Sequence, residues 1–233
     1  MKKSKASKGT AFTLAEILIT LGIIGVVAAM TIPALITNQQ KKVIPTKLRR
    51  ALSVMNQAYR AAYDDIGEAT PSEVRNMGGV EYVKKYWAPY LKISNICNTY
   101  TDCGYKKNTP FKYLDGSNAH NTVASSKDNV IWFQTAEGFV YAVFYYDMGN
   151  GNIASFMYVD VTGGSGPNIF GKDVFILARL IDGEKGGFVA PYGYRSTTNS
   201  VNNGCVKGGN NYSNTCAEKI RRAGWQIDSS YPW

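Results

Sequence analysis

Residues 12–36 read FTLAEILITLGIIGVVAAMTIPALI, twenty-five residues in which Glu16 is the only charge. A helix rises about 1.5 Å per residue, so this stretch is long enough to cross the roughly 30 Å hydrocarbon core of a bilayer. Lysines precede it at positions 2, 3, 5 and 8, and a basic run follows at Lys41, Lys42, Lys47, Arg49 and Arg50. The segment therefore predicts a single membrane-spanning helix.

A secretory signal peptide is the alternative, because Val27-Ala28-Ala29 resembles a loose cleavage site. Glu16 argues against it. A carboxylate near the centre of a span costs about 2.5–3.5 kcal/mol on insertion scales, less near the edge, and an export signal has no need of it. Basic residues flank the span on both sides and leave the orientation open, but the four cysteines favour an oxidising location outside the cytoplasm for the rest of the chain.

The run from Lys8 to Glu16, KGTAFTLAE, resembles the processing site of type IV pilins and the related type II secretion pseudopilins. The resemblance implies a leader peptide over residues 1–11, cut by a prepilin peptidase between Ala11 and Phe12. It also implies an N-methylated Phe12, with Glu16 as the fifth residue of the mature chain. Ala11 departs from the glycine that the family usually has before the cut.

In that family the N-terminal helix, here 12–36, is the element that assembles subunits into a filament. The resemblance implies that Glu16 meets the amine of Phe12 in a neighbouring subunit, and a buried charge pair of this kind fixes register. Small residues would allow helices to approach closely; they are Gly22, Gly25, Ala28 and Ala29. Pro33 lies where the family often has a proline, and we expect a kink near Pro33, near Pro45 or near both.

Beyond the span, apolar residues recur at steps of three and four and predict an amphipathic continuation of the helix over 37–66. Gly67 and Pro71 end it. A shorter helix is predicted over 71–90, interrupted at Gly78-Gly79. The stretch 95–127 has turn residues and little periodicity, and is interpreted as a surface loop.

Strand-like runs follow at 130–135, 139–146, 153–161 and 174–181. Turn signals at 136–138 and at Asn150-Gly151 join them into an antiparallel meander of about four strands. The predicted fold class is α+β: a long N-terminal helix packed on this meander, pilin-like, with residues 67–233 forming a globular head. A short helix over 216–224 is expected near the C-terminus.

Cys97 with Cys103, and Cys205 with Cys216, form two local pairs around loops rich in small polar residues. Four cysteines allow three connectivities, and the spacing favours the two local bridges. Zinc is the alternative, but neither pair has the short gap of a zinc knuckle and His120, the only histidine, has no cysteine near it. His120 is interpreted as a surface loop residue.

Two further motifs suggest chemistry without completing it. Residues 166–173, GPNIFGKD, approach the phosphate-binding pattern GxxxxGK[ST], but Asp173 replaces the hydroxyl that would bind magnesium. Asp160, Asn168 and Asp173 could offer oxygens to calcium, and Asx turns explain the same residues equally well. No cofactor is therefore predicted.

The formal charge of the 233-residue chain is +9, of which four charges lie in the first eleven residues, leaving 9 − 4 = +5 for the rest. No nucleic-acid-binding module is recognisable, and nucleic acid is not an expected partner. No nucleophile, base and orienting group occur in a recognisable pattern, so we expect no enzyme.

The resemblance implies a pilin or minor pilin, a structural subunit of a type IV pilus-like filament. The alternatives are a type II secretion pseudopilin and, more distantly, a membrane-tethered binding protein that never polymerises. The implied partners are copies or relatives of this chain, the prepilin peptidase, the inner-membrane assembly platform and the membrane. The implied location is the bacterial cytoplasmic membrane with the head outside, and then a pilus or pseudopilus.

Overall fold

The computed structural model describes residues 12–108, 110–119, 130–149, 152–181, 187–208 and 213–233. The chain divides into two compact units, one ending at Lys41 and one from Lys42 to Trp233, called here the C-terminal unit. Helix α1, Leu14–Ile66, contributes to both. It ends where Gly67 and Pro71 predicted, and it continues without interruption through Pro33 and Pro45.

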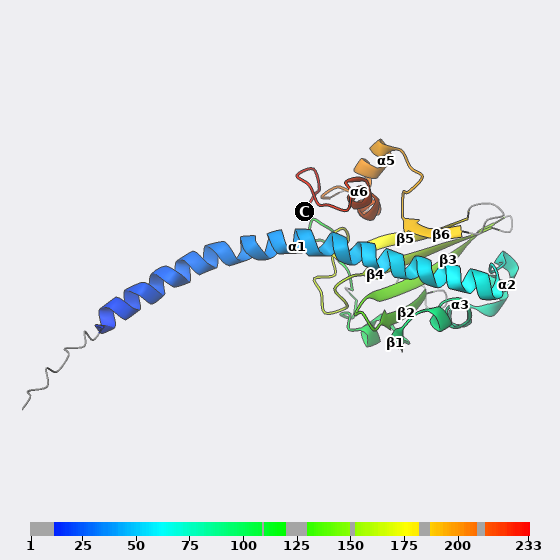
Figure 1. Ribbon diagram of the computed structural model, residues 1–233, viewed down its shortest axis with the longest axis horizontal. Helices are drawn as coiled ribbons and strands as arrows, with labels where there is room; N and C mark the ends of the chain where they lie inside the picture. Colours follow the sequence, from blue (N-terminus) through cyan, green and yellow to red (C-terminus); the bar gives the residue numbers. More distant parts are fainter. Residues whose placement is uncertain (1–11, 109, 120–129, 150–151, 182–186, 209–212) are drawn as a thin grey trace, which may run out of the picture. The chain divides into compact units, whose positions relative to one another are not determined.

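The C-terminal unit is built on one antiparallel sheet in which strands follow one another in chain order (Figure 1). The strands are β1 Ile93–Cys97, β2 Val130–Thr135, β3 Val140–Gly149, β4 Asn152–Asp160, β5 Val174–Ile181 and β6 Gly187–Pro191. The α+β class and the antiparallel meander are confirmed, but the sheet has six strands instead of about four. The turn at 136–138 joins β2 to β3, while Asn150-Gly151 lies outside the described residues.

The two unpredicted strands are the edges of the sheet, where sequence signals are weakest. In β1 the sequence ISNIC is exposed over its three middle residues, so it lacks the apolar alternation of an inner strand. Strand β6 is short and ends in Pro191, which an edge strand tolerates because its outward side needs no ladder donor. The surface-loop interpretation of 95–127 was wrong at its start, since Asn95–Cys97 belongs to β1.

Short helices fill the connections. The predicted helix over 71–90 is three pieces: α2 Pro71–Met77, α3 Gly79–Tyr86 and the 3-10 turn η1 Ala88–Tyr90. Gly78, at φ +78°, makes the expected break. A second 3-10 turn, η2 Tyr100–Cys103, follows β1, and α5 Thr198–Asn203 precedes the terminal helix α6 Cys216–Arg222.

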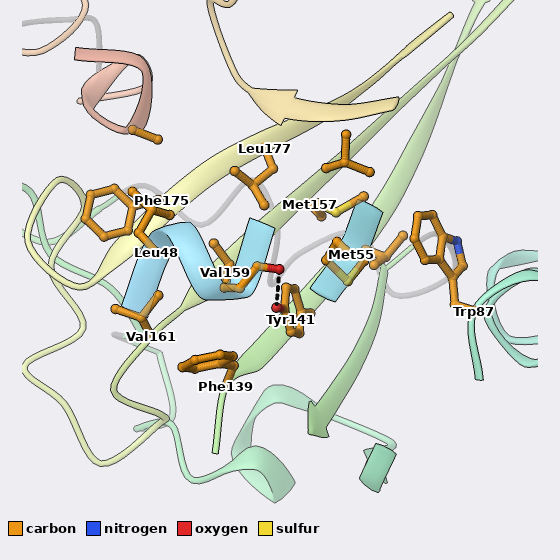
Figure 2. Packing of buried hydrophobic residues seen from close by; sticks show 14 of the residues in the cluster. Leu48, Met55, Trp87, Phe139, Tyr141, Met157, Val159, Val161, Phe175 and Leu177 are labelled. Atoms are coloured by element: carbon orange, nitrogen blue, oxygen red, sulfur yellow. Dashed lines mark hydrogen bonds between the residues drawn. The ribbon is translucent and has the colours of Figure 1, made fainter. Parts of the chain in front are cut away.

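The second half of α1 packs its apolar stripe on one face of the sheet (Figure 2). Leu48 and Met55 are fully buried there, and each stabilises the fold by roughly 1.5–3 kcal/mol relative to an exposed side chain. On the strand side Tyr141 lies among them, and its hydroxyl donates to the carbonyl of Ala51 at 3.2 Å. The amphipathic pattern of 37–66 thus reports the face that covers the sheet.

The same part of α1 also closes one edge of the sheet. Asn56 accepts a hydrogen bond from the Val189 amide at 2.9 Å and donates to the Val189 carbonyl at 2.7 Å. One turn on, the Tyr59 hydroxyl accepts the Gly187 amide at 2.8 Å. These side chains take up backbone groups of the edge strand β6 that would otherwise be open to another chain.

The opposite face of the sheet is covered by the connection between β1 and β2. Tyr105 and Phe111 are buried there against Trp132, and the rings of Tyr105 and Trp132 lie 5.2 Å apart. The stretch interpreted as surface loop is exposed at most of its described residues, but it also contributes buried aromatic side chains to the core. Its aromatic anchors stand between turn residues without periodicity, which is why the pattern hid them.

Candidate functional site

The candidate site is the start of α1, where the predicted processing and assembly residues lie. Ala11 is outside the described residues, and so is the predicted leader. Phe12 is exposed, and α1 begins two residues later. The Ile17 amide donates to the Thr13 carbonyl at 3.2 Å, which closes the first turn.

Thr13 and Glu16 cap this helix reciprocally. The Thr13 hydroxyl accepts the Glu16 amide at 3.2 Å, while the Glu16 carboxylate accepts the Thr13 amide and the Thr13 hydroxyl, both at 2.8 Å through Oε2. This is a capping box, in which two orphan groups at a helix start satisfy each other. The prediction for Glu16 did not include Thr13, although the T-x-x-E spacing before an apolar run carries that signal.

The capping box leaves half of the carboxylate available. Both bonds from Thr13 end on Oε2, and within the described part of the chain no hydrogen bond reaches Oε1 of Glu16. Negative charge at a helix start also complements the helix dipole. Glu16 is thereby held in one orientation with a free oxygen that a cationic group could approach.

From Leu14 to Ile36 the helix presents large apolar side chains to the outside along its whole length, and its most apolar window has no buried residue. By length and composition α1 could cross a membrane. A Cβ built on Gly22 or Gly25 would meet no atom within 4 Å, so both glycines lie on open helix surface. Pro33, which has no amide hydrogen to donate, sits within this exposed segment.

Both cysteine pairs form the local bridges that their spacing favoured. Cys97 is joined to Cys103, and Cys205 to Cys216. Among the described residues no cluster of three or more histidine, cysteine or acidic side chains could hold a metal ion. His120 lies outside the described residues.

The loop that resembles a phosphate-binding motif uses its amides internally. The amides of Asn168 and Ile169 donate to the Asp173 carboxylate at 2.8 and 2.7 Å. A strand, β5, follows at Val174, where a phosphate loop requires a helix. An Asx turn accounts for Asp160, whose carboxylate accepts the Thr162 amide at 2.9 Å, whereas the Asp173 carboxylate accepts loop amides four and five residues before it in the chain.

Comparison with known proteins identifies a family without assigning an activity. Residues 34–233 match a family model described as "Family of unknown function (DUF6613)". No curated protein and no solved structure matches the chain. The matched region takes in the second half of α1 and all of the sheet, and it begins after most of the exposed apolar segment.

Proposed function

We propose that this chain, which belongs to the DUF6613 family, is a structural subunit, pilin or minor pilin, of a type IV pilus-like filament. It is processed by a prepilin peptidase between Ala11 and Phe12. It then polymerises through its N-terminal helix. A long helix whose second half packs on an antiparallel sheet is the architecture that such subunits need.

The observation that carries the proposal is the exposed apolar surface of α1 with one acid at its start. Exposed apolar area on this scale needs lipid or other helices around it. In lipid alone the Glu16 carboxylate would raise the free energy of insertion without forming a compensating interaction. In a filament, Oε1 of Glu16 can accept a hydrogen bond from the amine that cleavage creates at Phe12 of a neighbouring subunit. A helix in the wrong register would leave one of these buried charges without its partner.

The capping box gives this pairing its geometry. Because Thr13 fixes the carboxylate through Oε2, the side chain does not have to be ordered when the neighbour arrives. In the membrane, lipid surrounds the helix and Oε1 of Glu16 has no partner. In the filament, other helices surround it and the Phe12 amine of a neighbouring subunit reaches Oε1. The membrane is a store of subunits, and the helix is the assembly element.

The experiment compares Glu16→Gln with the parent chain in cells that carry the assembly machinery. Glutamine keeps an oxygen for the Thr13 amide and removes the charge, so the helix start should persist while incorporation into sheared filaments falls at least tenfold. Thr20→Ala is the matched control, because within the described residues the Thr20 hydroxyl donates only to the Ile17 carbonyl one turn away. The control should assemble normally.

Normal incorporation of Glu16→Gln would contradict the proposed pairing. If the parent chain is found only in the membrane fraction, the result favours the alternative function, a membrane-tethered binding protein that never polymerises. Electron microscopy of the sheared fraction separates a long surface fibre from the short filament of a secretion pseudopilus.

A further inference from the structure

Two aspartates share a buried corner of the C-terminal unit. Asp160 is the last residue of β4, and Asp173 immediately precedes β5. They are 2% and 1% exposed. The Val161 amide donates to the Asp173 carbonyl at 2.9 Å, which ties the two chain segments together at this point.

Each carboxylate is surrounded by donors from its own loop or from the loop covering the sheet. Asp160 Oδ1 accepts the amides of Thr162 and Gly163, both at 2.9 Å. Its Oδ2 accepts the Tyr105 hydroxyl at 2.8 Å. Asp173 takes the two amides of the phosphate-like loop described above.

The Thr162 hydroxyl lies between the two carboxylates. Its Oγ1 is 3.1 Å from Asp160 Oδ1 and 2.8 Å from Asp173 Oδ2. A hydroxyl has one hydrogen and can donate it to one of these oxygens only. When both aspartates are ionised, the other contact therefore brings two oxygens together without a proton between them.

Among the residues that the structure describes, no cationic side chain forms an ion pair with either aspartate. The titratable groups that face Asp160 are the Asp173 carboxyl and the Tyr105 hydroxyl. Neither group can carry a positive charge. Two buried carboxylates at one site cannot both ionise without a large penalty, and a single proton relieves it.

We propose that the Asp160–Asp173 pair holds one proton near neutral pH, and that its release loosens this corner, so that acidification stabilises the C-terminal unit. The pair thus makes the contact between the sheet and the loop that carries Tyr105 dependent on pH. It acts independently of whether the chain polymerises.

The direction of the effect follows from the ionisation of Asp160. Burial, and then the charge of Asp173, raise the pKa of Asp160 from 3.8 to about 7. Burial also raises the pKa of Asp173. Between pH 3.8 and about pH 7 the folded chain keeps a proton on Asp160 that the unfolded chain has lost. The free energy of unfolding therefore falls as pH rises through this window, and it levels off above it.

The test is urea unfolding of the full chain in detergent micelles, with both bridges intact, from pH 5 to pH 8. Asp160→Asn imitates the protonated side chain and removes its titration. The unfolding constant of the parent, relative to this variant, should rise by up to about tenfold per pH unit over the acidic part of the range. Asp228→Asn changes an exposed acid and should keep the pH dependence of the parent.

Parallel pH profiles for the parent and Asp160→Asn would overturn the proposal. If that variant does not fold, the carboxyl carbons of Asp160 and Asp173 in the parent decide by NMR. A midpoint above pH 5 at either carbon supports the shared proton, and midpoints below pH 5 at both carbons exclude it.

Discussion

Thr13 and Glu16 form one functional group at the start of α1. Glu16 was predicted to be the assembly residue, and the structure adds that Thr13 holds its carboxylate through one oxygen. A single threonine thus decides where the other oxygen points. Removing the Thr13 hydroxyl would weaken the proposed filament contact because the Glu16 carboxylate would lose its fixed orientation, while its charge would stay the same.

Thr13→Val should therefore loosen the first turn of α1 without changing the charge of the chain. Loss of an N-cap costs about 1 kcal/mol, which corresponds to roughly fivefold faster opening of that turn. Hydrogen exchange of the amides of residues 14–17, measured by NMR in micelles, reports it. Thr13→Ser keeps the hydroxyl and should exchange like the parent; equal exchange in Thr13→Val would contradict the capping box.

At the scale of elements, α1 has a second role that its sequence pattern did not reveal. Periodicity predicted the apolar stripe that covers the sheet, but it says nothing of polar side chains beside that stripe. Asn56 is one of these, and it satisfies both backbone groups of Val189 on the edge strand β6. The helix thus stabilises the sheet and also blocks one of its edges.

Asn56→Ala should lower the free energy of unfolding by about 1–3 kcal/mol, because it leaves a backbone donor and acceptor without partners in a half-buried position. The midpoint of urea unfolding measures this loss. Gln57→Ala is the control one residue away, since Gln57 is exposed and, in the described part of the chain, its side chain bonds only the Ser53 hydroxyl. A shift of equal size in both variants would mean that Asn56 contributes helix propensity alone.

The sequence predicted what rests on strong periodicity and left out what rests on tertiary context. Four strands, the end of α1 and the break at Gly78 follow from local chemistry. The edge strands β1 and β6 depend on neighbours for their hydrogen bonds, and Tyr105 and Phe111 depend on a sheet face that no local pattern announces. At the candidate site Glu16 stood out by its charge, whereas Thr13 was marked only by its T-x-x-E spacing from Glu16.

At the scale of the whole molecule, the second bridge joins the start of α6 to the segment that follows α5, and it packs against the loop before β5. Cys216 is fully buried, and a Cβ on Gly171 would come within 2.9 Å of its sulfur. The Tyr231 hydroxyl donates to the Gly171 carbonyl from the tail. The described part of the segment between β6 and α6 buries few apolar side chains, so the bridge supplements the packing that holds this segment in place.

Replacing both Cys205 and Cys216 by alanine should lower the free energy of unfolding by about 2–3 kcal/mol, the loop-closure entropy that a bridge of this span removes from the unfolded chain. Urea unfolding under non-reducing conditions gives the value. An unchanged midpoint would show that the tail is held by packing alone.

The central claim is that α1 is an assembly element released by cleavage before Phe12, and the mature N-terminus tests it most directly. Mass spectrometry of the chain isolated from the membrane of its native cell should find a mature protein that begins at N-methylated Phe12, with residues 1–11 removed. A chain that begins at Met1, or near Thr31 after cleavage at Ala29, would contradict the account.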